Sequence, residues 1–347
     1  MAPKRQYYPE LDGIRAFAAL LIMTFHAVQL GMPVPGPISF AQTGVDLFFV
    51  LSGFLITSIL LVARQHDWDE VKTFYLRRAL RIFPLYYGYL IASVLLGSAI
   101  GWPFWVYLQN FWFSGGHPIA GPNHFWSLAI EEQFYLVWPF VVLFGPRKHL
   151  QALLWTVVGG AAVVRMFFAL HGHDVFSHTL TRADALAAGA ILAVWSNRES
   201  LQRKARLLMA GAVVFGVLMV GVGLTARQSG AVWFTTVKYD LIEGFYMCLL
   251  GVVLVGRLPR VNALLRTKVL RFIGRISYGL YVFHPVVFAW TFVRLRGYSW
   301  WVRGSAGYAI AFFVSLLSWY AYERNFIKLK DKVAPERRFT PRAPINV

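Results

Sequence analysis

The feature that most constrains this chain is a series of apolar stretches, each about as long as a helix that crosses a lipid bilayer. A helix needs about 20 apolar residues to cross the hydrocarbon core. The sequence therefore predicts an all-α membrane protein, a polytopic bundle of about ten transmembrane helices. The stretches lie at roughly residues 14–31, 43–63, 82–100, 124–145, 150–170, 183–196, 207–225, 240–256, 276–293 and 304–323.

Composition supports a bilayer as the solvent. Hydrophobic residues make up 57% of the 347 residues and charged residues only 14%, with a mean hydropathy of +0.53. A soluble domain of this length cannot bury that much apolar surface in one core. The single cysteine, Cys248, excludes an intramolecular disulfide framework and a thiol-based metal site, and we expect no bound metal.

The distribution of Lys and Arg predicts the orientation, because cytoplasmic loops of membrane proteins concentrate these residues. With ten helices and the N-terminus inside, the cytoplasmic segments hold 26 of the 34 basic residues and the opposite loops hold 6. The sequence therefore predicts that both termini are cytoplasmic. We expect one transmembrane domain over residues 1–327 and a basic, disordered cytoplasmic tail over 328–347.

The net charge of +18 does not point to a nucleic-acid partner, because the charge lies in short loops beside apolar spans. Anionic lipid headgroups account for it there. The same loops could also hold an anionic cytosolic substrate. The first apolar stretch is longer than the core of a signal peptide and lacks a small-residue cleavage site, so it is read as a retained helix.

Polar residues inside the apolar stretches are candidate functional residues, because they are costly in lipid. Arg15 and His26 are eleven residues apart in the first stretch. Helical geometry places them on one face, about 16 Å apart along the axis. Arg15 could instead be an interfacial anchor, and His26 could be a hydrogen-bonded packing residue.

The second stretch opens with Asp46, at a depth close to that of His26. An aspartate in a first helical turn is often only a cap. The loop after this stretch reads FYLRRALRIFP, in which Arg78 and Arg81 share a helical side. A basic segment on the membrane surface and a clamp for phosphates explain these arginines equally well.

The fourth stretch begins HFWSLAIEEQFYLVWP and carries two adjacent glutamates. His124, Ser127 and Glu131 fall on one helical face, and Glu132 points about 100° away. Glu131 is thereby predicted to face an internal cavity. The alternative is a structural ion pair with another helix, for which Arg165 is the candidate partner.

The ninth stretch reads ISYGLYVFHPVV. Ser277, Tyr281 and His284 form a polar stripe, and Pro285 loosens the backbone hydrogen bonding behind them. Three further charges at predicted helix ends could be merely interfacial: Arg182, Asp184 and Glu323.

Six motifs in order carry a family resemblance: YYPELDGIRAFAALLIMTFH, GVDLFFVLSGFLITS, RRALRIFP, HFWSLAIEEQFYL, RADALAAGAILA and ISYGLYVFHP. The chain resembles the acyltransferase-3 family of integral-membrane acyltransferases from residue 7 to about 325. The resemblance implies transfer of an acyl group, acetyl or succinyl, from cytosolic acyl-CoA to a hydroxyl of a cell-surface or secreted polysaccharide or lipid-linked glycan. It also implies a location in the bacterial cytoplasmic membrane.

In that family the residues associated with activity match Arg15, His26, Asp46, Arg78 and Arg81 of this chain. Some relatives carry an additional esterase-like domain. This chain stops shortly after its last predicted helix, so we expect acceptor chemistry on the membrane domain itself.

The chemistry of the candidate residues fits this implication. Arg78, Arg81 and Arg15 would dock the phosphates of acyl-CoA, the expected co-substrate. His26 would either deprotonate the acceptor or carry the acyl group, oriented by Asp46 or Glu131. The residues expected to line or support the substrate pocket are His124, Ser127, Glu132, Tyr281 and His284.

A proton-coupled transporter or lipid flippase is the competing interpretation. Buried His, Glu and Asp residues serve as proton relays in such proteins. No inverted repeat is visible in the sequence, although such repeats can be undetectable in a single chain.

Overall fold

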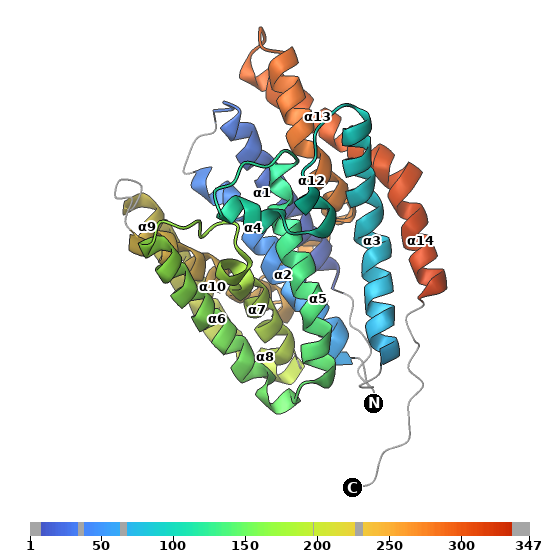
Figure 1. The fold of residues 1–347 in the computed structure, drawn as a ribbon. Helices are drawn as coiled ribbons and strands as arrows, with labels where there is room; N and C mark the ends of the chain where they lie inside the picture. Colours follow the sequence, from blue (N-terminus) through green and yellow to red (C-terminus); the bar gives the residue numbers. More distant parts are fainter. Residues whose placement is uncertain (1–7, 34–37, 63–67, 197, 226–231, 335–347) are drawn as a thin grey trace.

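The computed structural model describes residues 8–33, 38–62, 68–196, 198–225 and 232–334, and these are almost entirely helical with no strand among them. The helices run alongside one another, with α6 and α9 at one edge of the bundle and α3 and α14 at the opposite edge (Figure 1). Their bounds are α1 Pro9–Gln29, α2 Gly44–Val62, α3 Trp68–Leu95, α4 Gln109–Ser114, α5 Trp126–Phe144, α6 Arg147–Leu170, α7 Thr179–Trp195, α8 Arg198–Arg203, α9 Ala205–Thr225, α10 Val232–Val255, α11 Pro259–Leu265, α12 Lys268–Arg294, α13 Trp300–Ser318 and α14 Arg324–Val333. Short helical turns complete the order: η1 Ile38–Thr43, η2 Trp102–Val106, η3 Asn123–Phe125 and η5 Trp319–Glu323.

Each of the ten predicted stretches falls on a helix: α1, α2, α3, α5, α6, α7, α9, α10, α12 and α13. Within the described residues, 7 helices are long and apolar enough to cross a membrane, or 8 if the bent pair α10 and α11 counts as one span. Three of the ten helices, α3, α7 and α10, do not meet these criteria individually, and the reasons can be identified. Helix α3 carries arginines and tyrosines, α7 has only 17 residues, and α10 contains three charges. The count of ten spans and the cytoplasmic termini stay predictions.

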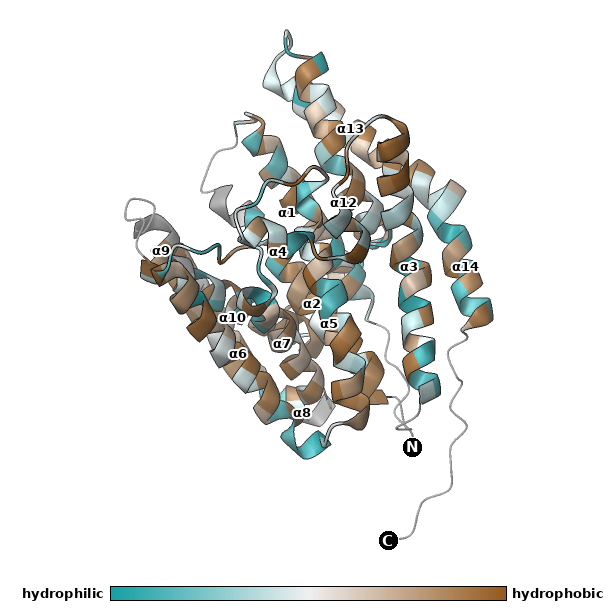
Figure 2. Ribbon diagram, in the orientation of Figure 1, coloured by the Kyte–Doolittle hydropathy of each residue, from teal (hydrophilic) through white to brown (hydrophobic). Residues whose placement is uncertain are grey.

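The outward surface of the bundle is apolar, as a lipid environment requires. Hydrophobic residues cover α6 and α9 (Figure 2), where Val163 is 70% exposed and Val217 is 66% exposed. An apolar surface of this extent is rare on a soluble monomer. The chain is therefore an integral membrane protein.

Small residues allow the two helix pairs that build the centre to pack closely. A Cβ at Gly53 of α2 would overlap the Leu186 carbonyl, and a Cβ at Gly189 of α7 would overlap the Val50 carbonyl. In the second helix pair, Gly274 of α12 lies equally close to the backbone of α1 at Asp12. Close backbone approach through small residues is the usual packing mode of membrane helices. It holds α1 against α12 and α2 against α7.

The connection between α3 and α5 is tied into the bundle by buried amides. Gln109 donates to the Phe125 carbonyl at 2.8 Å, and Gln133 donates to the Tyr107 carbonyl at 2.7 Å and to Asn110 Oδ1 at 2.9 Å. Gln109 and Asn110 are fully buried. These bonds satisfy polar groups that would otherwise be costly to bury, and they fix η3 and α4 as a wall of the site.

The C-terminal segment differs from its prediction. The expectation of a disordered tail from 328 is wrong for residues 328–333, which belong to α14 and lie beside α3 (Figure 1). The physical reason is the pattern of α14, which is apolar on one face and basic on the other, so that one face can pack. Arg77 of α3 donates to the Ala334 carbonyl at 2.5 Å and anchors the helix end. Residues 335–347 of the predicted tail lie outside the described residues.

Candidate functional site

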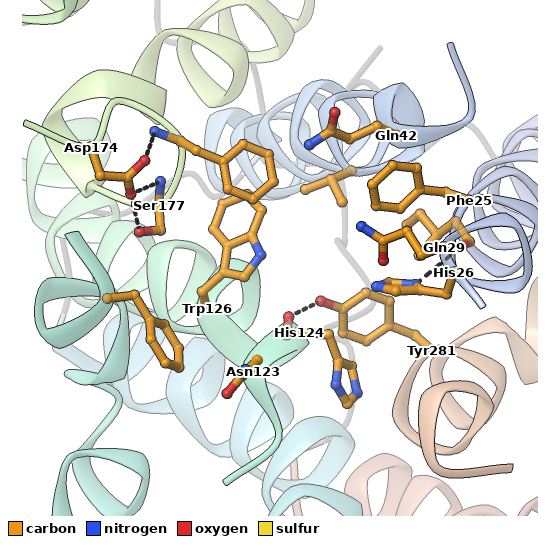
Figure 3. Close-up of a pocket in the computed structure, with 14 residues that line it drawn as sticks. Phe25, His26, Gln29, Gln42, Asn123, His124, Trp126, Asp174, Ser177 and Tyr281 are labelled. Atoms are coloured by element: carbon orange, nitrogen blue, oxygen red, sulfur yellow. Dashed lines mark hydrogen bonds between the residues drawn. The ribbon is translucent and has the colours of Figure 1, made fainter. Parts of the chain in front are cut away.

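A cavity of about 320 Å³, here named the outer cavity, opens among α1, α2, η3 and the segment before α7 (Figure 3). His26, Gln29 and Tyr281 lie near one end of it, and Asp174 and Ser177 lie at the other. Its lining residues are Ile22, Phe25, His26, Gln29, Gln42, Val45, Phe113, Asn123, His124, Trp126, Asp174, Phe176, Ser177 and Tyr281.

Three histidines from three helical elements lie close together, and two of them, His26 and His124, line this cavity. His26 Nδ1 lies 2.9 Å from His284 Nε2 and 3.2 Å from the Ile22 carbonyl. His284 is fully buried, and its Nδ1 lies 2.8 Å from the Leu280 carbonyl. The ring of His124 is centred 6.5 Å from that of His26 and 5.7 Å from that of His284. The structure thus brings together residues that are 258 positions apart in the chain.

Pro285 lies in the turn of α12 whose backbone contacts this cluster. Proline has no N–H and interrupts the hydrogen-bond ladder of the helix that contains it. Within the same turn, the Val282 carbonyl accepts a hydrogen bond from His124 Nε2 at 3.3 Å. The predicted loosening of the helix at Pro285 therefore coincides with a contact to the site.

A second cavity of about 100 Å³, here named the inner cavity, adjoins the first. The two share Ile22, Val45 and Tyr281 as a common wall. The Tyr281 hydroxyl donates to the His124 carbonyl and therefore accepts from Ser127, 2.5 Å away. The inner cavity is lined by Arg15, Ile22, Val45, Phe48, Phe49, Ser52, Arg78, Arg81, Ile82, Ser127, Leu128, Glu131, Tyr135, Ser277, Tyr278 and Tyr281.

The inner cavity gathers positive charge. Arg15, Arg78 and Arg81 line it together. The Arg78 guanidinium stacks 3.8 Å from the centre of the Tyr135 ring, and the nearest carboxylate to Arg15 in an ion pair is Asp12, at 3.9 Å. Glu131, the one carboxylate in the lining, accepts a hydrogen bond from Ser52 at 2.7 Å. Three guanidinium groups around one small cavity form an environment suited to an anion.

Asp46 does not contact His26, which corrects one expectation from the sequence. It is buried and forms an ion pair with Arg182 of α7. The close packing of α2 on α7 places these two first turns opposite each other, so the carboxylate meets a guanidinium instead of an imidazole. Glu131 likewise faces the inner cavity and Ser52. Neither carboxylate orients His26 in the structure.

The sequence offers Arg165 only as an alternative partner for the glutamates of α5. Arg165 contacts Asp184 and, at 2.5 Å, Asp240, and not the glutamates of α5. Together with the Asp46–Arg182 pair it forms what we name the ion-pair cluster: Asp46, Arg165, Arg182, Asp184 and Asp240. The cluster joins α2, α6, α7 and α10 and lines neither cavity. Arg182 and Asp184 are therefore buried and not interfacial.

Two other predicted positions lie apart from the cavities. Glu132 lines neither of them, in keeping with its different helical face. Glu323, expected at the interface, is only 6% exposed and accepts a hydrogen bond from Ser318 at 2.8 Å. Within the described ranges, no group of three or more His, Cys, Asp or Glu residues could hold a metal ion.

The sequence missed the polar residues that complete the outer cavity. Gln29, Gln42 and Asn123 lie at helix ends or in turns, where an amide is unremarkable, and only the fold brings them around His26. Asp174 holds the wall before α7 by accepting the N–H groups of Phe176 at 2.9 Å and Ser177 at 3.0 Å.

The next residue along, His178, caps α7. Its Nδ1 accepts the Leu180 N–H at 3.2 Å, and burial lowers the pKa of His178 and so favours the neutral form that can accept.

Comparisons with known proteins place these features in a family context. The model of the acyltransferase-3 family, described as an acyltransferase domain, matches residues 8–324. The chain is 33% identical over 329 residues to the putative peptidoglycan O-acetyltransferase YrhL of Bacillus subtilis, covering 81% of this chain and 49% of that protein. It is 33% identical over 325 residues to the peptidoglycan O-acetyltransferase OatA of Listeria monocytogenes (82% and 50%), and 30% identical over 317 residues to the O-acetyltransferase OatA of Staphylococcus aureus (81% and 51%). The chain thus spans about half the length of these relatives. No solved structure matches it.

Proposed function

The chain belongs to the acyltransferase-3 family, and from this premise we propose that it transfers an acyl group from cytosolic acyl-CoA to a hydroxyl of a cell-wall polysaccharide or its lipid-linked precursor. One observation carries the proposal: a small cavity lined by three arginines adjoins a larger cavity that contains an imidazole. The relatives are named as O-acetyltransferases, and two of them as acting on peptidoglycan. Acetyl is therefore the proposed acyl group, and peptidoglycan the proposed acceptor.

The proposed topology has ten spans in the bacterial cytoplasmic membrane, with both termini in the cytoplasm. Its support is the asymmetry of basic residues and the coincidence of all ten apolar stretches with helices. Arg78 and Arg81 follow the second span, on the side that the basic loops mark as cytoplasmic. The inner cavity then faces the donor, and the outer cavity faces the acceptor on the opposite side of the membrane.

The inner cavity would hold the phosphates of the donor. Coenzyme A is a polyanion, and guanidinium groups bind phosphates through paired, charge-assisted hydrogen bonds. Arg15 and His26 lie on one face of α1, about 16 Å apart along its axis. This separation is comparable with the extended pantetheine arm, so a donor bound at the arginines can direct its thioester past Tyr281 toward His26.

The outer cavity has the chemistry of a sugar site. Gln29, Gln42 and Asn123 supply side-chain amides that can both donate to and accept from hydroxyl or acetamido groups. Its volume of about 320 Å³ lies at the low end of ligand pockets, which hold about 300–1,000 Å³. We therefore propose that one sugar residue of the acceptor enters the cavity, while the rest of the glycan stays outside.

His26 would perform the proton chemistry at its Nε2 atom. In the direct route, Nε2 takes the proton of the acceptor hydroxyl as the oxygen attacks the thioester carbonyl, the C–S bond breaks, and the proton passes to the thiolate of coenzyme A. In the relay route, Nε2 itself attacks the thioester, the C–S bond breaks and coenzyme A leaves as the thiolate. The acceptor hydroxyl then displaces the acyl group from nitrogen, and the proton it loses neutralises the thiolate. Both routes yield one ester and one free thiol.

The test is covalent transfer by the purified protein in lipid nanodiscs. With [¹⁴C]acetyl-CoA and an N-acetylmuramic acid-containing disaccharide, we expect acetylated sugar and free coenzyme A in equal amounts. Label trapped on His26 with donor alone would identify the relay route, and its consistent absence would identify the direct route. If reconstituted protein instead moved solute with protons and neither transferred nor hydrolysed the acyl group, the chain would be a transporter and the proposal would fail.

A further inference from the structure

We propose that His284 is a positioning residue that fixes the tautomer of His26, so that Nε2 of His26 presents a free lone pair to the outer cavity. This inference rests on the proposed function, since it assigns the partner of the imidazole that function uses. The sequence had pointed to Asp46 or Glu131 for this task, and both are engaged elsewhere.

The first step concerns the proton on His284. Its Nδ1 lies 2.8 Å from the Leu280 carbonyl, and a carbonyl oxygen can only accept. Nδ1 of His284 therefore carries the hydrogen. A neutral imidazole carries one N–H, so Nε2 of His284 has a lone pair and accepts. No solvent competes for this assignment, because His284 is fully buried.

The second step concerns which nitrogen of His26 carries the hydrogen. His26 Nδ1 lies 2.9 Å from His284 Nε2 and 3.2 Å from the Ile22 carbonyl. Both neighbours are acceptors, so Nδ1 of His26 is the donor and its Nε2 holds the lone pair. An isolated neutral histidine can place its hydrogen on either nitrogen. The His284 contact selects the form that a base or nucleophile at the cavity requires.

The third step concerns how protonation or acylation affects the hydrogen bond between His26 and His284. When His26 Nε2 gains a proton or an acyl group, Nδ1 still donates to His284 and the bond is kept. When His284 itself is protonated, both of its nitrogens become donors, and His26 Nδ1 can no longer donate to it. A neutral imidazole therefore takes the place that a carboxylate holds in a hydrolase triad. Helices α1 and α12, which carry the two rings, pack closely at Gly274.

Substitution of His284 separates positioning from packing. We expect His284→Ala to lower kcat about 100-fold, within the range of about 10²–10⁴ for a misplaced general base, with KM for acetyl-CoA changed less than twofold. Gln can accept from His26 Nδ1 through its Oε1, so His284→Gln should recover at least about tenfold over the alanine variant. His149, exposed at the start of α6, provides the control His149→Ala, which should behave as wild type. Equal activity of the alanine and glutamine variants would overturn the proposal, as would full activity of His284→Ala.

A direct reading of the tautomer does not depend on activity. In ¹⁵N-histidine-labelled protein in nanodiscs, with the His26 signals assigned by their loss in His26→Ala, we expect a protonated Nδ1 and an unprotonated Nε2 near neutral pH. In His284→Ala the His26 signals should shift toward the other tautomer. A wild-type His26 protonated at Nε2 would contradict the inference even if acyl transfer is observed. The expected tautomer in a protein that transfers no acyl group would leave the positioning intact and reject the proposed function.

Discussion

Buried polar residues are paired with opposite charges in the ion-pair cluster, whereas those of the outer and inner cavities line open space. In the ion-pair cluster, Arg165 and Arg182 each face carboxylates from neighbouring helices. In the inner cavity three arginines share the lining with one carboxylate, and in the outer cavity His26 is part of the lining. Both sets are costly in a membrane. The difference teaches that a buried charge serves the fold when the protein itself neutralises it, and is available to a ligand when it does not.

Asp46 and His26 make this difference concrete, because they lie at similar depth on successive helices. His26 faces a cavity and Asp46 faces Arg182. The family resemblance of the sequence implies a link to activity for both positions. We infer different reasons for the two: chemistry at His26, and the packing of α2 on α7 at Asp46.

The largest effect is expected at His26. His26→Ala should abolish acyl transfer while the protein remains in the membrane at its normal level, because both proposed routes use the imidazole of His26 for the chemical step. The assay is acetylation of the glycan, beside an immunoblot of the membrane fraction and the control His149→Ala. Retained transfer by His26→Ala would remove the imidazole from the mechanism.

The second effect tests the other side of the comparison. Asp46→Ala leaves Arg182 buried without its partner, and breaking a buried pair in this way costs about 3–5 kcal/mol. We expect a lower melting temperature and lower abundance, with part of the loss restored when Arg182→Met is added. A normally stable but inactive Asp46→Ala protein would break the comparison, since Asp46 would then act on a substrate.

A smaller effect is expected at the inner cavity. Replacing Arg78 and Arg81 together by alanine should weaken acetyl-CoA binding by about 10- to 100-fold, since one hydrogen bond to a charged group contributes about 1.5–3 kcal/mol. Calorimetric titration of acetyl-CoA measures it, and Arg206→Ala, which removes an exposed arginine, is the control. Unchanged donor affinity would return these arginines to the membrane-surface interpretation.

The smallest effect is expected at the rim of the outer cavity. Gln29→Ala should raise KM for the glycan a few-fold, the loss expected from one neutral hydrogen bond of about 1 kcal/mol, with KM for acetyl-CoA unchanged. Gln151, exposed on α6, supplies the matched control Gln151→Ala. If Gln29→Ala changed KM for acetyl-CoA and KM for the glycan together, the assignment of the donor to the inner cavity and the acceptor to the outer cavity would be wrong.

The sequence predicted the features that depend on the periodicity of a single helix. The apolar stretches located the helices, and the spacing of His124, Ser127 and Glu131 placed one face of η3 and α5 toward the interior, where these residues line the two cavities. The partners across helices were not predictable. Which helix faces which depends on close approaches such as that at Gly53, and a single sequence does not reveal them. Hence Asp46 was assigned to His26 instead of Arg182, and the contact from His284 to His26 was not foreseen.

In the proposed mechanism, donor and acceptor reach His26 from opposite sides of the membrane. The most direct measurement uses proteoliposomes of one orientation, with [¹⁴C]acetyl-CoA available only on the face that carries Arg78 and Arg81 and the glycan only on the other. We expect labelled ester on the glycan with wild-type protein and none with His26→Ala. Labelled ester formed only when both substrates share one face, or formed equally by His26→Ala, would contradict it.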